Sequence, residues 1–139
     1  SQHPMPPLPA TERSLHIVVV EDDLLQRDLL QQGLAHFGHE VRSASSGCEL
    51  DALLQQAPAD IIILDLGLPG EDGIDIAARL RPHWRGGMVM ITARGQTEDR
   101  ILGRDMGADL YFVKPIDLRE LASALQNLAA RLPPNRRSS

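Results

Sequence analysis

Carboxylates directly follow two apolar runs in this 139-residue chain. The run Ile17–Val20 leads into Glu21 and Asp22, and the run Ile61–Leu64 leads into Asp65. If both runs are buried strands of one sheet, the three carboxylates meet at one edge, where like charges repel strongly. Such a cluster needs a cation or a chemical task. A set of oxygen ligands suits a hard cation, so we expect Mg²⁺, or Mn²⁺ in its place.

Three further groups are predicted to lie at the same edge. The Gly67 carbonyl, in the tight loop after Asp65, could give the metal one more oxygen. Two other apolar runs lead into Thr92 and Lys114, which supply a hydroxyl and an ammonium group. A carboxylate can attack a phosphoryl group while a metal ion, a lysine and a hydroxyl neutralise the transferred oxygens. We therefore predict that Asp65 becomes an aspartyl phosphate.

Short apolar segments that alternate with longer helical patterns indicate the elements that carry these residues. The predicted strands are His16–Val20, Glu40–Ser43, Asp60–Leu64, Met88–Thr92 and Leu110–Val113. The predicted helices are Asp23–Phe37, Cys48–Gln56, Gly73–Leu80, Glu98–Met106 and Leu118–Arg131. Five β–α units joined by right-handed crossovers form a parallel sheet with helices on both faces, an α/β fold. Such sheets bind ligands at the carboxyl ends of their strands.

Capping residues support several of these boundaries. Asp23 and Asp117 are suitable N-caps for the first and last helices. Gly38 and Gly107 are suitable residues to end the first and fourth helices. The segment 40–43 is more polar than the other predicted strands, which favours a position at an edge of the sheet.

The motifs VVVEDD, ILDLGLPGEDG, MITA and GADLYFVKP have an order and spacing that resemble those of receiver domains in bacterial two-component response regulators. The resemblance runs from about Leu15 to Arg131 and is strongest to regulators of the OmpR type. It implies a doubly wound (βα)5 fold similar to that of flavodoxin, a three-layer sandwich. The five parallel strands would follow the order 2-1-3-4-5. It also implies a signalling phosphoacceptor that is not an enzyme and promotes only its own phosphorylation and dephosphorylation.

The resemblance also implies roles for individual residues. Asp65 would be the phosphoacceptor and would receive phosphate from the phosphohistidine of a sensor histidine kinase. The Mg²⁺ ligands would be Glu21, Asp22, Asp65 and the Gly67 carbonyl. Thr92 and Lys114 would contact the phosphoryl oxygens, and Tyr111 would turn inward when Thr92 moves toward the phosphate. The peptide bond between Lys114 and Pro115 would be cis.

Receivers of the OmpR type commonly form homodimers on phosphorylation, through their fourth helix, fifth strand and fifth helix. This chain keeps Arg100 and Glu120, a plausible ion pair on that face. It has Leu110 where the subfamily usually has aspartate, and Ala124 where the partner arginine is usual. We therefore expect the dimer face to include Arg100, Leu110 and Glu120, with a geometry that differs from that of the subfamily.

The ends of the chain differ in composition from its middle. We expect residues 1–13 to be a disordered lead, residues 14–131 to be the receiver domain, and residues 132–139 to begin a linker. The resemblance implies that the linker leads to a DNA-binding output domain that regulates transcription. The alternative is a stand-alone receiver, or one with another output, that acts by contact with other proteins.

Composition excludes several other classes of protein. The net charge of −5 argues against contact between these residues and nucleic acid, so DNA would be bound only through the output domain. The single Cys48 excludes an internal disulfide and a cysteine-rich zinc site, and we expect its side chain to be partly buried. No apolar run approaches the length of a membrane span, so we expect a cytoplasmic protein without membrane contact.

The sequence excludes two other classes of α/β protein because each lacks a required motif here. A phosphatase of the haloacid dehalogenase type would carry a second aspartate two residues after its nucleophile, where this chain has Gly67. A dinucleotide-binding domain would need a glycine-rich loop after its first strand. This chain has acidic residues there, and these would repel a pyrophosphate.

Overall fold

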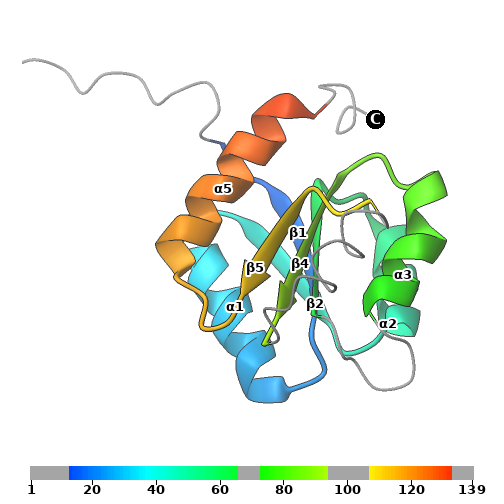
Figure 1. Ribbon diagram of the computed structural model, residues 1–139, viewed down its shortest axis with the longest axis horizontal. Coiled ribbons are helices and arrows are strands. Elements are labelled where there is room, and N and C mark those ends of the chain that lie inside the picture. Colours follow the sequence, from blue (N-terminus) through cyan, green and yellow to red (C-terminus); the bar gives the residue numbers. More distant parts are fainter. Residues whose placement is uncertain (1–12, 66–72, 94–106, 133–139) are drawn as a thin grey trace, which may run out of the picture.

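The computed structural model describes residues 13–65, 73–93 and 107–132 (Figure 1). The strands are β1 (His16–Val20), β2 (Glu40–Ala44), β3 (Ile61–Asp65), β4 (Gly87–Thr92) and β5 (Leu110–Val113). The helices are α1 (Leu24–His36), α2 (Gly47–Gln56), α3 (Gly73–Leu80) and α5 (Leu118–Arg131), with a short 3-10 helix, η1 (Arg81–His83). Each of these strands and α-helices agrees with a predicted one to within one residue at either end. The predicted helix Glu98–Met106 lies outside the described residues.

The five strands form one parallel sheet in the order β2-β1-β3-β4-β5, which confirms the predicted topology and the edge position of β2. Helices α1 and α5 cover one face of the sheet, and α2 and α3 cover the other (Figure 1). Val20 at the end of β1 pairs with Leu64 of β3, and Asp65 pairs with Ile91 of β4. The carboxyl ends of the three central strands therefore lie next to one another.

Two apolar clusters, one on each face, hold the layers together. Alternate residues of the central strands point to opposite faces, so Ile17 packs toward α1 and α5 while Val18 packs toward α2 and α3. Both are fully buried. Five leucines in and next to α5 pack on the first of these faces: Leu118, Leu121, Leu125, Leu128 and Leu132. Burial on both faces explains why the central strands read as continuous apolar runs.

Side-chain caps fix where the helices begin. The Asp23 carboxylate accepts a hydrogen bond of 2.8 Å from the Gln26 N–H, and Asp117 accepts bonds from the first turn of α5. Gly38 and Gly107 have φ values of +93° and +97°. Gly38 supplies the left-handed backbone predicted where the chain leaves α1, whereas the helix that Gly107 was predicted to end lies outside the described residues. Both predicted N-caps are confirmed.

The prediction for Cys48 is wrong, because its side chain is exposed. The residue lies in the first turn of α2, where the buried positions are Gly47 and Leu50. Cys48 therefore lies on the solvent side of this helix. In the described parts of the chain, no helix is long and apolar enough to cross a membrane.

Candidate functional site

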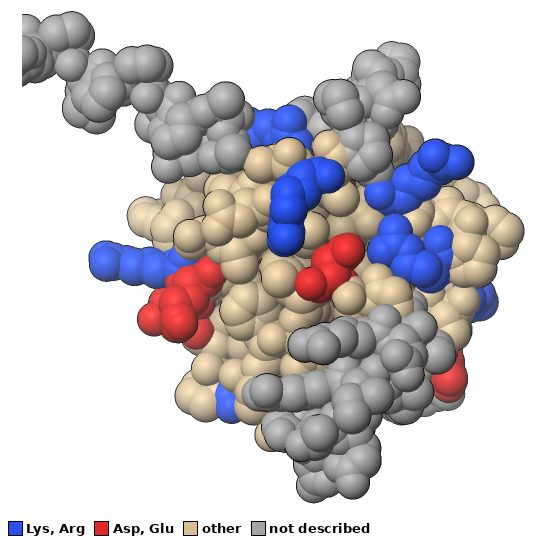
Figure 2. All heavy atoms as spheres, turned by 45° about the horizontal axis from the view of Figure 1, so that its top comes forward, with Lys and Arg blue, Asp and Glu red and all other residues tan. Residues whose placement is uncertain are grey.

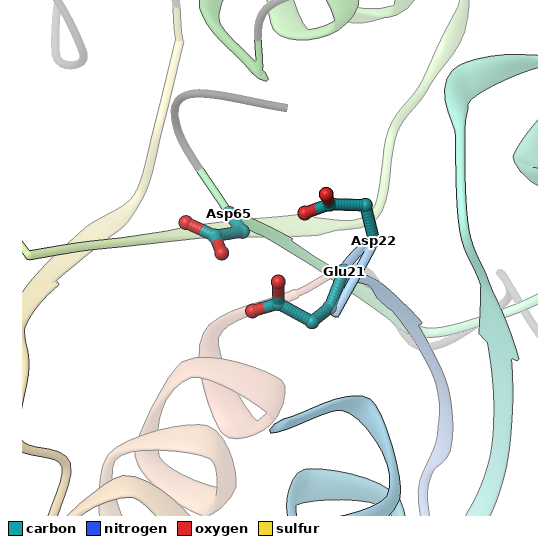
Figure 3. Close-up of side chains that lie close together, drawn as sticks. All are labelled: Glu21, Asp22 and Asp65. Carbon is teal, nitrogen blue, oxygen red and sulfur yellow. The ribbon is translucent and has the colours of Figure 1, made fainter. Parts of the chain in front are cut away.

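Three carboxylates converge where β1 and β3 end (Figure 3). Glu21 and Asp22 follow β1 directly and Asp65 is the last residue of β3, so the sheet itself brings them together. One oxygen from each carboxylate lies within 4.8 Å of the others. The side chains of Glu21 and Asp65 are 3% and 13% exposed, whereas Asp22 is exposed. The site therefore has a buried floor and one acidic group at its rim.

Lys114 places a positive charge against this floor. Its Nζ lies 3.2 Å from Oδ2 of Asp65 and 3.5 Å from Oε1 of Glu21. Its backbone N–H donates to the Thr92 carbonyl at 2.7 Å, which joins the end of β5 to the end of β4. The peptide bond from Lys114 to Pro115 is cis, as predicted. Lys114 is also the only lysine among the 139 residues.

The electrostatics of the site favour a bound cation. Burial, then a hydrogen bond and charge repulsion from Asp65, raise the pKa of Glu21 to about 7. A hydrogen bond between two carboxyl groups requires a proton. Near neutral pH, a proton therefore occupies the position between the carboxyl groups where a metal ion could bind. Burial works against the charged form of Lys114, yet the charges of Asp65 and then Glu21 leave its pKa raised.

The donor set fits a hard divalent ion. It consists of carboxylate oxygens, one of them at the solvent-facing rim, which leaves room for the water ligands that Mg²⁺ retains. The opposite end of the molecule has a different character. Figure 2, in which the top of Figure 1 is turned toward the viewer, shows basic side chains spread over that side and acidic ones in only a few places. The three clustered carboxylates lie at the carboxyl ends of the strands, away from this basic side.

The two residues predicted to act as a switch lie on adjacent strands. Thr92 ends β4 and is 1% exposed, and Tyr111 on β5 pairs with Met90 of β4. The Tyr111 ring is half-buried, packs toward the cluster under α2 and α3, and has a buried hydroxyl oxygen. The ring is therefore turned into the protein, and β4 lies between its strand and β3.

Gln26 was missed by the sequence analysis. Its Oε1 accepts a hydrogen bond from Nζ of Lys114 at 2.5 Å, so it belongs to the shell of groups around the site. No motif marks it, because the contact joins the first turn of α1 to the end of β5 across 88 residues of sequence.

Several predicted residues are not brought into the site or cannot be placed. The Gly67 carbonyl and Arg100 lie outside the described residues. Leu110 is half-buried and packs toward the cluster under α1 and α5, and Glu120 is exposed on α5. The proposed dimer face therefore stays a prediction.

Residues 17–126 match the family described as the response regulator receiver domain. This chain belongs to that family. The receiver is 39% identical over 117 residues to the TorCAD operon transcriptional regulatory protein TorR of Escherichia coli O157:H7, covering 84% of this chain and 51% of that protein. It is 37% identical over 121 residues to the transcriptional regulatory protein AruR of Pseudomonas aeruginosa, covering 84% and 50%.

Solved structures agree with this assignment. The receiver domain of the response regulator TorR superposes with a TM-score of 0.80 at 38% identity, covering 86% of this chain and 99% of that one. The BeF3-activated receiver domain of Klebsiella pneumoniae RstA gives a TM-score of 0.78 at 29% identity, covering 83% and 98%. The receiver spans about half the length of the curated relatives it matches.

Proposed function

We propose that Asp65 accepts a phosphoryl group from the phosphohistidine of a sensor histidine kinase. The observation that carries the proposal is the position of the Asp65 carboxylate, which lies between two further acids and the Lys114 ammonium group. In the transfer, a P–O bond forms to an Asp65 oxygen and the P–N bond to the kinase histidine breaks. The electron pair of that bond stays with the imidazole, which takes up a proton.

Glu21, Asp22 and Asp65 would hold the metal ion, with the Gly67 carbonyl as a further ligand. Bound Mg²⁺ supplies positive charge that neutralises the oxygens of the transferred group. Lys114 supplies a second positive charge from the side of β5, and Thr92 would donate its hydroxyl. These residues orient the phosphoryl group and stabilise charge, which is most of what a protein contributes to phosphoryl transfer.

Helix α1 offers an apolar surface next to the site for the kinase. Leu24, Leu25 and Leu29 are 62%, 68% and 61% exposed, and they follow the acidic pair within two turns of helix. A cavity of about 380 Å³ between α1 and the start of α5 is lined by Leu29 and reaches Lys114. An apolar face next to charged chemistry is typical of a docking surface, so we place the kinase here.

The signal would leave the site through Thr92 and Tyr111. A phosphoryl group of charge near −2 on Asp65 would draw the Thr92 hydroxyl toward it, and the Tyr111 ring would fix the new arrangement of β4 and β5. The dimer face, with Arg100, Leu110 and Glu120, would then form the homodimer. Tyr111 is the only tyrosine in the chain, so its ring resonances would report this change without ambiguity.

The output proposed for the whole protein is regulation of transcription. TorR and AruR are named as transcriptional regulatory proteins and are about twice as long as the part that this chain matches. We propose that a DNA-binding domain follows this receiver in its gene. The coding sequence after Ser139 tests this proposal, because a reading frame that stops there would favour a receiver that acts by protein contact alone.

Phosphate incorporation at Asp65 tests the chemistry. Wild-type protein incubated with Mg²⁺ and acetyl phosphate should gain one base-labile phosphate, visible as a mass increase. Asp65→Asn should gain none, since an amide cannot accept the group. Asp75→Asn is the matched control on α3 and should be labelled like the wild type. Equal labelling of Asp65→Asn and wild type would refute the assignment.

A further inference from the structure

Gln26 holds the lysine of the site from outside the acidic cluster. The Lys114 ammonium group has three N–H donors and three neighbouring acceptors: Oδ2 of Asp65, Oε1 of Glu21 and Oε1 of Gln26. Two of these acceptors are carboxylates of the candidate metal site, and the third is a neutral amide. Gln26 is therefore the one of the three that has no part in the acidic cluster.

The position of Gln26 is fixed by the start of α1. Its own N–H is bonded to the Asp23 carboxylate at 2.8 Å, and the next residue, Arg27, donates to the Glu21 carbonyl at 3.0 Å. These bonds tie the first turn of the helix to the end of β1, next to the acidic residues. The Gln26 amide is thus carried by a turn whose place relative to Glu21 is set by hydrogen bonds.

The three acceptors differ in what happens to them during the proposed reaction. One oxygen of Asp65 would form the new P–O bond, and Glu21 would be a ligand of the metal ion. Lys114 must then release these carboxylates and donate to the phosphoryl oxygens instead. The Gln26 carbonyl competes for neither the metal nor the phosphorus, so it can keep the ammonium group in place while its other partners change.

We propose that Gln26 is a positioning residue that aims Lys114 at the phosphoryl group on Asp65. This inference rests on the proposed function. It assigns to the first turn of α1 a part in the chemistry that is separate from the metal ligands, and it predicts that Lys114 is misdirected when the amide is removed.

The test compares Gln26→Met, which has similar length but lacks the amide acceptor, with the control Gln32→Met on the exposed side of the same helix. Phosphate incorporation from acetyl phosphate with Mg²⁺ should slow roughly tenfold in Gln26→Met, as expected for loss of one hydrogen bond to a charged group, and stay unchanged in the control. The Mg²⁺ dissociation constant and the urea midpoint should change little in either protein. Gln26→Asn, whose amide is one methylene too short, should reproduce the slow rate without added apolar surface.

A second measurement uses the metal-free protein and no reaction. Lys114 is the only lysine, so a ¹H–¹⁵N spectrum tuned to ammonium groups should show a single lysine side-chain signal, protected from exchange by its partners. This signal should weaken in Gln26→Met and Gln26→Asn but persist in Gln32→Met. Wild-type rates and an unchanged signal in both Gln26 variants would overturn the inference and leave the proposed function intact. A wild-type protein that takes up no phosphate would instead overturn the proposed function.

Discussion

Nζ of Lys114 lies 3.2 Å from Oδ2 of Asp65, so the ammonium group of the residue after β5 contacts the carboxylate of the last residue of β3. Strand β4 lies between these two strands, and the contact passes over its carboxyl end. Under the proposed function, the lysine therefore lies beside Asp65 in space that the transferred phosphoryl group would need. Lys114 therefore stabilises these carboxylates and, under the proposed function, would also contact the phosphoryl group.

Lys114→Met should separate these two roles. Phosphate incorporation on Asp65 should fall by about two orders of magnitude, which is typical for loss of one charge-stabilising donor. Mg²⁺ should bind more tightly, because a competing positive charge has gone. Stopped-time phosphorylation assays and a metal titration measure the two effects. Arg119→Met, which removes an exposed cation from α5, should change neither, and a fully active Lys114→Met would contradict the role of the lysine.

The affinity for Mg²⁺ should depend on pH through Glu21. Because the pKa of this group is raised to about 7 in the metal-free site, a proton must leave before the carboxylate can bind metal. The dissociation constant should therefore decrease as pH rises from about 6 to about 8, and then level off. Glu21→Gln should bind Mg²⁺ more weakly and lose most of this pH dependence. A flat profile in the wild type would show that Glu21 does not exchange a proton for the metal.

Folding stability without metal should fall as pH rises from about 4.5 to about 7. The ordinary pKa of a glutamate is 4.5 and that of Glu21 in the folded protein is about 7, so the folded state holds this proton more tightly. The resulting stability is fully present below about pH 4.5 and is lost as pH rises through about 7, at about 1.4 kcal/mol per pKa unit.

Urea unfolding followed by fluorescence of Trp84, the only tryptophan, measures this effect. Glu21→Gln should unfold at a urea concentration that depends less on pH between about 5 and 8. In the wild-type protein, excess Mg²⁺ should restore the stability that is lost at the upper end of that pH range. A wild-type midpoint that rises with pH over the same interval would contradict the direction of the pKa shift.

Arg81 should be important for stability and not for chemistry. Its guanidinium donates to the carbonyls of Gly107 and Gly86 at 3.2 and 3.0 Å, and it lies 3.6 Å from the Asp109 carboxylate. Arg81→Ala removes the donor to these two carbonyls and should cost about 2–3 kcal/mol of unfolding free energy. Thermal and urea denaturation measure it, and phosphorylation of the folded variant should remain normal.

The control for this prediction is Arg79→Ala. Arg79 pairs with Asp51 at 3.1 Å, but both side chains are about two-fifths exposed at 41% and 43%. Exposed pairs of this kind contribute at most about 1 kcal/mol. If the two variants lose equal unfolding free energy, the carbonyl contacts of Arg81 stabilise the fold no more than an exposed ion pair does, which would contradict the prediction.

The parts of the fold that could be predicted are those that leave a local pattern in the sequence. Burial on both faces makes β1, β3 and β4 continuous apolar runs, and the residues at their ends then fall at one edge by topology alone. Asp65 and Lys114 could be assigned to the same site for this reason. Cys48 was misplaced because residue type predicts average burial, whereas its exposure depends on which side of α2 faces the sheet.

Gln26 could not be predicted for a different reason. Glutamine in the first turn of a helix is ordinary, and its role depends on a lysine that is distant in sequence. Such a contact exists only once α1 and β5 have packed against the same sheet. The fourth predicted helix, with Arg100, and the Gly67 carbonyl stay predictions.

The single lysine also has a consequence for covalent modification of the protein. Acetylation of a lysine removes its charge and two of its three N–H donors. Within these 139 residues the only lysine that could be acetylated is Lys114, which contacts Asp65. Any lysine acylation detected by mass spectrometry in this part of the protein is therefore a change next to the proposed phosphoacceptor, and we expect it to interfere with phosphorylation of Asp65.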